Sequence, residues 1–350
     1  ITLGTRYAAG VVFLPLDDAD AARCRAELEA QVQRAGAHAR GWRVVPTNEA
    51  VCGQLARDTL PRIEQLFVDA GAEQTEDGFT LALFLARRRA EQALHTVEDF
   101  YVTTLSPSGI SYKGMVLPDK LNTFYPDLQR SDLSSSAIVF HQRFSTNTLP
   151  RWPLAHPFRL LAHNGEINTI EGNRRWAQAR SKVWKTPRFA ITEFDPVISM
   201  HGSDSQSLDN MLELLIAGGM DLLQALRILM PPATQSLEFK DADLAAFYEF
   251  YGLNTEPWDG PAGIVACDSR YAACMLDRNG LRPARWLLTS DRHFLVASEA
   301  GVWELPAERI TRKGKLGPGE MMAIDLKRGD LLDSDAIDRI NRARAPYKQW

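Results

Sequence analysis

Four short polar segments of this 350-residue chain hold residue types that can bind charged groups or stabilise a negatively charged oxygen. They span residues 141–148, 162–168, 202–207 and 277–285. We expect all four at strand ends, the third just before a helix, and loops at such places often carry functional side chains. We therefore take these four segments as the candidate site.

The first segment contains an arginine, Arg143, separated by two residues from the apolar run 137–140, which predicts a buried strand. Burying a guanidinium there is costly unless an anion pairs with it. Its planar fork of donors suits two-point binding of a carboxylate. The alternative is an ordinary polar loop.

The second and third segments have both a structural and a chemical interpretation. Asn164-Gly165 is a common tight-turn pair. It could equally form an oxyanion site, because glycine lets its backbone N–H approach a substrate closely and asparagine adds a side-chain donor. In the third segment, Ser205 or Ser207 could cap the next helix, and Asp204 could bind an ammonium group. The fourth segment could simply connect two strands.

The apolar runs around these segments predict strands at both ends of the chain with helices between. The expected strands cover residues 11–14, 42–45, 79–85, 100–105, 110–116, 137–140, 263–267, 271–276, 285–289, 293–297, 321–325 and 329–332. The expected helices cover residues 17–33, a stretch starting at 87, the stretch after 207 and residues 221–230. Strands 100–105 and 110–116 are predicted to pair as a hairpin. This order predicts an α+β fold of two sheets packed together and covered by helices.

Composition limits the function classes. Lysine and arginine number 40 and aspartate and glutamate 44, for a net charge of −4, which does not indicate nucleic-acid binding. No apolar run approaches the roughly 18 residues of a membrane helix, so no membrane association is expected. The four cysteines form no CxxC pair, which predicts free thiols in a reducing compartment, and we expect a cytoplasmic protein.

Six sequence pieces together carry a resemblance to a known family. They are HQRFSTNT at 141–148, WPLAHPF at 152–158, AHNGEINT at 162–169, SDSQSLD at 203–209, EPWDG at 256–260 and DRNGLRPAR at 277–285. In this order they resemble the class II glutamine amidotransferase domain of the glutamate synthase large (alpha) subunits, over nearly the whole chain. The motifs EPWDG and DRNGLRPAR argue against the class II amidotransferases of purine or amino-sugar synthesis.

The resemblance implies a fold and a role for each site residue. The fold is the N-terminal-nucleophile αββα sandwich of two mainly antiparallel sheets covered by helices, as a single domain over residues 1–350. Arg143 and Thr146 would hold the α-carboxylate of L-glutamine, and Asp204 its α-ammonium. Asn164 and the backbone N–H of Gly165 would form the oxyanion hole.

The family's nucleophile is a cysteine at position 1 of the mature chain, whose own α-amine acts as the base. This sequence starts with Ile1, and its cysteines, Cys24, Cys52, Cys267 and Cys274, all lie inside the chain. We therefore expect that the start of the domain is missing and that the chain alone is inactive. The alternative is a natural homologue without nucleophile that binds glutamine and senses it.

The resemblance also implies a pathway for the parent enzyme. Glutamine hydrolysis would release ammonia, which a synthase domain of the same polypeptide would use to aminate 2-oxoglutarate reductively. That domain, expected beyond this chain, would carry FMN and an iron–sulfur cluster and take electrons from a small NADPH-oxidising subunit or from ferredoxin. No cofactor and no metal is expected within residues 1–350.

Overall fold

The computed structural model describes residues 1–143, 148–234 and 241–350. It divides the chain into two compact units, Ile1–Arg159 and Leu160–Trp350, which are described separately. Both combine antiparallel sheets with helices, so the predicted α+β class is confirmed. The expectation of one domain over residues 1–350 stays a prediction. None of the helices in the described ranges is long and apolar enough to cross a membrane.

The first unit is built on a four-stranded antiparallel sheet of order β2-β3-β1-β4. The strands are β1 (Tyr7–Leu14), β2 (His38–Val44), β3 (Arg62–Asp69) and β4 (Tyr101–Ser106). The α-helices are α1 (Asp18–Arg34), α2 (Gln54–Asp58), α3 (Glu76–Ala93) and α4 (Leu121–Phe124). Short 3₁₀ turns cover Glu49–Val51, Pro118–Lys120, Pro126–Gln129 and Trp152–Leu154.

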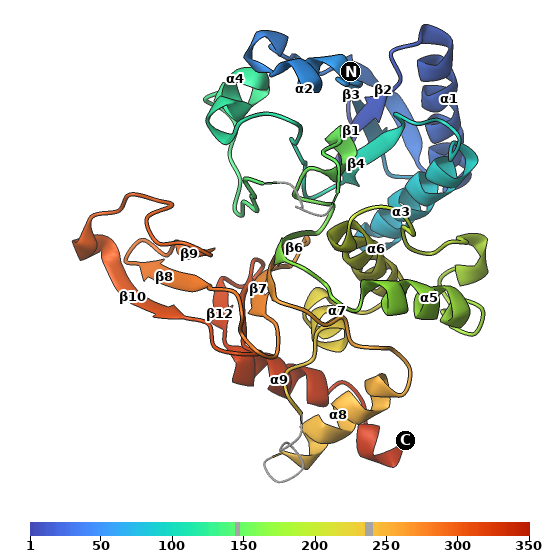
Figure 1. Cartoon of the computed structure of the whole chain (residues 1–350). Coiled ribbons are helices and arrows are strands. Elements are labelled where there is room, and N and C mark those ends of the chain that lie inside the picture. The colour runs from blue at the N-terminus through green and yellow to red at the C-terminus, as the bar shows by residue number, and fades with distance from the viewer. Residues whose placement is uncertain (144–147, 235–240) are drawn as a thin grey trace. The chain divides into compact units, whose positions relative to one another are not determined.

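Helices α1 and α3 lie side by side and pack on the sheet (Figure 1). Apolar residues at helical spacing, among them Leu28 of α1 and Leu83 of α3, join Val12 and Leu66 of the sheet in one buried core. The other face of the sheet, with Phe13 and Ile63, packs in a second cluster against aromatic residues of the segments after β4. Successive side chains along the strands thus point to opposite faces of the sheet, and each face packs in its own hydrophobic core.

Helix α1 begins where predicted, because the Asp17 carboxylate accepts the N–H of Asp20 at 2.9 Å. The predicted strand 79–85 is wrong. Thr75 caps a helix there by accepting the N–H of Gly78 at 3.0 Å, and Phe79, Leu83 and Ala86 are buried at helical spacing. A short apolar run is compatible with a strand or with a helix, and here the cap at Thr75 begins a helix.

Two further predicted strands of this unit are also wrong. Residues 110–116 form no strand, because side chains bond some of their backbone groups: the Tyr125 hydroxyl donates to the Lys113 carbonyl at 2.8 Å, and the Ser111 N–H donates to the Thr104 hydroxyl at 3.2 Å. Residues 137–140 are not a buried strand either. Ile138 is 77% exposed and Phe140 50% exposed, so this run of four residues contributes no core side chain here.

The second unit holds a five-stranded sheet of order β12-β11-β7-β6-β5 and a three-stranded sheet of order β10-β8-β9, with antiparallel pairing in both. The strands are β5 (Leu161–Gly165), β6 (Ala262–Cys267), β7 (Tyr271–Leu276), β8 (Arg285–Thr289), β9 (Phe294–Ala297), β10 (Ile310–Lys315), β11 (Met321–Asp325) and β12 (Asp330–Leu332). The six strands predicted between 263 and 332 are confirmed as β6–β9, β11 and β12.

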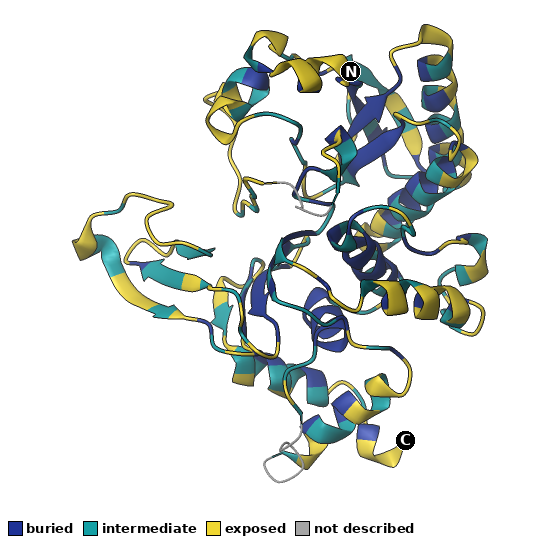
Figure 2. Cartoon of the chain, viewed as in Figure 1, coloured by how far each residue is buried: buried dark blue, intermediate teal, exposed yellow. Residues whose placement is uncertain are grey.

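The α-helices of this unit are α5 (Ile170–Arg180), α6 (Asp204–Ala217), α7 (Leu222–Leu229), α8 (Ala242–Gly252) and α9 (Ser334–Arg342), with 3₁₀ turns at Ile191–Glu193, Ala307–Arg309 and Tyr347–Gln349. Helix α6 contacts β5, α7 contacts β7, and α9 contacts β11 and β12. All of α7 is buried, and much of α6 is buried too (Figure 2). The helices predicted after 207 and over 221–230 are confirmed.

Candidate active site

Strand β5 ends at Asn164 and Gly165, which lie opposite Gly263 and Ala262 of β6. Gly165 has φ +148°, and a Cβ added to it would stand 1.8 Å from the Pro261 carbonyl oxygen. Any other residue would therefore clash with the neighbouring backbone. The pair ends a strand and does not form the two-residue turn that its sequence also allowed.

The hydrogen-bond pattern shows where the N–H of Gly165 points. Antiparallel pairs alternate between hydrogen-bonded and non-hydrogen-bonded positions. The N–H of Glu166 donates to the Pro261 carbonyl at 2.9 Å, which makes 164 and 166 the hydrogen-bonded positions and 165 the other kind. The N–H of Gly165 thus points away from β6, and β5 is the edge strand of this sheet.

The side chain of Asn164 is half-buried at the same place. Its neighbour across the ladder is Gly263, which has no side chain that could bond the amide. Among the residues that the structure describes, none hydrogen-bonds the Asn164 side chain. Asn164 and Gly165 therefore present two uncommitted N–H donors next to each other.

The loop after Gly165 is held by the segment 259–261. The N–H of Thr169 donates to the Asp259 carbonyl at 3.2 Å, and the N–H of Asp259 donates to the Thr169 hydroxyl at 3.0 Å. Gly260, at φ +157°, passes so close to Glu166 that a Cβ would stand 2.0 Å from its carbonyl oxygen. The sequence suggested no such bracing role for 256–260.

Asp204 is the first residue of α6, and its carboxylate reaches the same loop. One oxygen accepts the N–H of Ile167 at 2.8 Å and the other accepts the N–H of Ser205 at 2.7 Å. The helix cap is Ser203, whose hydroxyl accepts the N–H of Gln206 at 3.1 Å, so the prediction of Ser205 or Ser207 as cap is wrong. Asp204 is half-buried.

Three further residues near Asp204 have structural roles that the sequence did not indicate. The Ser205 hydroxyl lies 2.9 Å from His163 Nδ1 and joins α6 to β5. Arg174 of α5 donates to the Ser207 hydroxyl at 3.0 Å and to the Gly202 carbonyl at 2.6 Å. Buried Asp209 accepts the N–H groups of Leu160 and Leu161 at 2.9 and 3.1 Å. The segment 203–209 thus fixes the start of β5.

The structure brings Asn164, Gly165 and Asp204 together within the second unit. Arg143 belongs to the first unit, where its backbone N–H donates to His141 Nδ1 at 3.0 Å. Its side chain is exposed, so the expectation of a guanidinium at the end of a buried strand is wrong. Thr146 lies outside the described residues.

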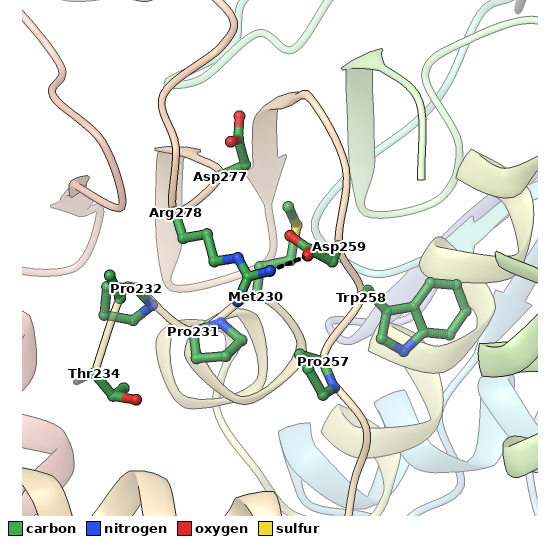
Figure 3. Close-up of a pocket in the computed structure, with 10 residues that line it drawn as sticks. Met230, Pro231, Pro232, Thr234, Pro257, Trp258, Asp259, Asp277 and Arg278 are labelled. Atoms are coloured by element: carbon green, nitrogen blue, oxygen red, sulfur yellow. Dashed lines mark hydrogen bonds and ion pairs between the residues drawn. The ribbon is translucent and has the colours of Figure 1, made fainter. Parts of the chain in front are cut away.

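The fourth polar segment forms a turn at the end of β7. Buried Asp277 accepts the N–H of Ala262 at 3.0 Å and that of Asn279 at 2.9 Å. The next residue, Arg278, forms an ion pair of 2.5 Å with Asp259 (Figure 3). Arg278 and Asp259 line a cavity of about 150 Å³ that Met230 and the prolines 231, 232 and 257 also border. This segment therefore does more than connect two strands.

The four cysteines are free thiols, as predicted, and lie on separate elements or strands. Burial raises the pKa of Cys274 to about 12 and that of Cys267 to about 11. Burial also raises the pKa values of Cys24 in α1 and of Cys52. All four are therefore protonated near neutral pH, and thiols in that state are poor nucleophiles.

Within the described ranges, no three histidine, cysteine or acidic side chains gather in the way a metal ion requires. An iron–sulfur cluster needs four converging thiolates. Two of the four cysteines lie in each unit, and all four keep raised pKa values. The described residues therefore do not fit such a cluster.

Comparison with known proteins agrees with the sequence pieces quoted above. The family model for class-II glutamine amidotransferases matches residues 1–350. The glutamate synthase [NADPH] large chain of Azospirillum brasilense is 39% identical over 351 aligned positions, covering 99% of this chain and 23% of that protein. Ferredoxin-dependent glutamate synthase 2 of Synechocystis is 41% identical, covering 99% of this chain and 22% of that protein.

The glutamate synthase [NADPH] large chain of Bacillus subtilis is 35% identical over 99% of this chain. The chain spans less than a quarter of the length of these three relatives. A solved glutamine phosphoribosylpyrophosphate amidotransferase from Bacillus subtilis aligns with a TM-score of 0.30 at 15% identity, over 93% of this chain and 48% of that one. The assignment rests on the family match over the whole chain. The chain belongs to the class-II glutamine amidotransferases.

Proposed function

We propose that this chain is the glutamine-hydrolysing part of a glutamate synthase. The observation that carries the proposal is the pair of free donors at the end of β5, the side-chain amide of Asn164 and the outward N–H of Gly165. In the reaction, L-glutamine and water give L-glutamate and ammonia. The carbonyl oxygen of the side-chain amide becomes an oxyanion in the tetrahedral intermediate.

Two preorganised N–H donors stabilise that oxyanion more than they stabilise the neutral carbonyl, and such selective stabilisation raises kcat. The strand geometry supports this role for Gly165. Its N–H is excluded from the β5–β6 ladder, and with φ at +148° and the Pro261 carbonyl close by there is no room for a side chain. The donor is therefore in place before the substrate arrives.

The proposed charge clamps hold the other end of the substrate. Asp204 would accept the α-ammonium of glutamine. Its carboxylate is already oriented by the N–H groups of Ile167 and Ser205, and the oxygen that accepts the Ile167 N–H keeps a further lone pair. We assign the α-carboxylate to Arg143 and Thr146, as the resemblance implies.

The names of the relatives support the second half of the reaction. Relatives at 35–41% identity over 99% of the chain are glutamate synthases. In the proposed enzyme, ammonia, 2-oxoglutarate, two electrons and two protons give glutamate and water in a synthase domain elsewhere in the polypeptide. We place the FMN and the iron–sulfur cluster there, with a small NADPH-oxidising subunit or ferredoxin as electron donor.

The nucleophile is proposed to lie outside the four cysteines of this chain. Their burial and raised pKa values support this, as does the lack of any neighbouring α-amine to act as base. The 350 residues alone would then bind glutamine without hydrolysing it. The free thiols also support the proposed location in the cytoplasm, a reducing compartment.

The alternative is a homologue that senses glutamine and contains no nucleophile. It would keep Arg143, Asn164 and Asp204, and would bind L-glutamine as the enzyme does. The two proposals separate on one assay, the release of glutamate and ammonia from L-glutamine by the full-length protein. Release supports the enzyme, and binding without release supports the sensor.

Arg143→Lys in the full-length protein should raise the KM for glutamine by about tenfold or more, because a point charge cannot replace a two-point guanidinium contact. Steady-state kinetics with L-glutamine measure this. Arg23→Lys, on the exposed face of α1, is the matched control and should leave KM unchanged. An unchanged KM in Arg143→Lys would remove Arg143 from the α-carboxylate site.

Asp204→Asn should weaken glutamine binding by about 10- to 100-fold, since a charge-assisted hydrogen bond to the ammonium is lost. The amide oxygen of the asparagine can still accept the N–H of Ile167, so the loop should stay in place. Calorimetric titration with L-glutamine measures the change. Asp335→Asn, an acidic residue in the first turn of α9, is the control. Equal affinity in both variants would contradict the ammonium role.

A further inference from the structure

The segment 256–260 separates the loop 165–169 from the turn that begins at Asp277. One side of the segment is bonded to that loop, and the other side faces the cavity shown in Figure 3. On the side of the cavity, the Asp259 carboxylate forms an ion pair with Arg278 of that turn, at 2.5 Å. Arg278 itself does not belong to the proposed substrate site.

The backbone of Asp259 holds the far end of the loop. It exchanges two hydrogen bonds with Thr169, through its carbonyl at 3.2 Å and its N–H at 3.0 Å. The following residue, Gly260, lies against Glu166 without room for a side chain. A shift of Asp259 would therefore displace the loop that starts at Gly165.

Arg278 directly follows a buried, hydrogen-bonded residue at the end of β7. The preceding residue, Asp277, is 2% exposed and accepts the N–H of Ala262 at 3.0 Å, while its carbonyl accepts the N–H of Gly319 at 2.8 Å. The guanidinium thus extends from the end of β7 to the side chain of Asp259. The ion pair connects the core of the sheet to the loop.

We propose that Arg278 is a positioning residue for glutamine hydrolysis: through Asp259 it fixes the loop that orients the N–H of Gly165 and the amide of Asn164. This inference rests on the proposed function. Arg278 need not touch glutamine. Its effect is on the rate of the chemical step, because donors that are misplaced in the transition state lower kcat.

The partial exposure of the Arg278–Asp259 ion pair allows a positioning role in catalysis to be distinguished from a role in folding alone. The side chain of Arg278 is 45% exposed and that of Asp259 is 27% exposed, and pairs of this kind add little to global stability. Removing Arg278 should therefore leave the melting temperature nearly unchanged while the loop loosens and kcat falls. A role in folding alone would lower the melting temperature and leave kcat per folded molecule unchanged.

The experiment uses the full-length protein with Arg278→Ala, Asp259→Asn and the double variant. The control is Arg309→Ala, which removes an ion pair of the same length and similar exposure between Arg309 and Asp291. We expect kcat for glutaminase activity to fall about tenfold in each single variant with KM within about twofold, since the lost interaction acts in the transition state. The double variant should be no worse than either single one.

Hydrogen exchange of the peptide covering residues 161–170 gives a second readout that does not depend on activity. Exchange of the Glu166 and Thr169 amides should be faster in Arg278→Ala than in wild type and in Arg309→Ala. Wild-type kcat and wild-type exchange in Arg278→Ala would overturn the proposal, as would additive effects in the double variant. If wild type itself releases no ammonia, the proposed function fails, and the exchange rates alone decide on the role of Arg278.

Discussion

Asn164→Ala in the full-length protein should lower kcat for glutamine hydrolysis by about 10²- to 10³-fold, the usual effect of removing one oxyanion donor. The KM should change little, because the amide donor contributes mainly in the transition state. The reason lies in the geometry: the side chain of Asn164 has no hydrogen-bond partner among the described residues, and it stands beside the outward N–H of Gly165. Initial-rate measurements of ammonia release test this.

Asn122→Ala, an exposed asparagine of the first unit, is the matched control and should keep wild-type kcat. The variant Asn164→Asp keeps the size of the side chain and replaces the amide donor by a negative charge. A carboxylate of the same size offers no donor and repels the oxyanion, so its kcat should be at least as low as that of Asn164→Ala. A kcat within threefold of wild type in Asn164→Ala would rule out the oxyanion role.

Gly165→Ala should be harmful in two ways at once. The added Cβ would stand 1.8 Å from the Pro261 carbonyl oxygen, and φ near +148° is strained for any other residue. Backbone strain of this kind costs about 1–3 kcal/mol, before the clash is counted. We expect a lower melting temperature together with loss of hydrolysis, since the only relief is to move the donor.

Gly172→Ala provides the opposite case in the same unit. Gly172 lies in α5 with no atom within 4 Å of an added Cβ, and replacing a helical glycine by alanine stabilises by about 1 kcal/mol. Thermal unfolding of both variants gives the comparison. If Gly165→Ala melted at or above the wild-type temperature with full activity, the close approach of β5 to Pro261 would be wrong.

The sequence predicted the part of the fold that local patterns specify. Strands β6 and β7 were predicted correctly because two apolar runs flank a short polar turn, and α1 because Asp17 precedes a helical pattern. Residues 79–85 were predicted as a strand but lie in α3, since a run of seven apolar and small residues is compatible with a strand or a helix. Residues 137–140, of which Ile138 and Phe140 are exposed, pair with no strand in the described part of the chain, and no local pattern indicates this.

The candidate site shows the same limit. Asn164, Gly165 and Asp204 were proposed from their types and neighbours, and their roles stay a prediction. The supporting contacts were not, because backbone bonds such as Thr169 to Asp259 are made by atoms that every residue has. The hydrogen bond between His163 and Ser205 joins residues 42 positions apart, and spacing along the chain does not predict such a pair.

The most direct test follows the amide nitrogen of glutamine. The full-length protein is given L-glutamine labelled with ¹⁵N in the side-chain amide, together with 2-oxoglutarate and, in turn, NADPH, NADH or reduced ferredoxin. With one of these donors, each turnover should yield one unlabelled glutamate from glutamine and one ¹⁵N-glutamate from 2-oxoglutarate, and Asn164→Ala should lose both. Unconsumed glutamine with every donor, or ¹⁵N found only as free ammonia, would contradict the assignment to a glutamate synthase.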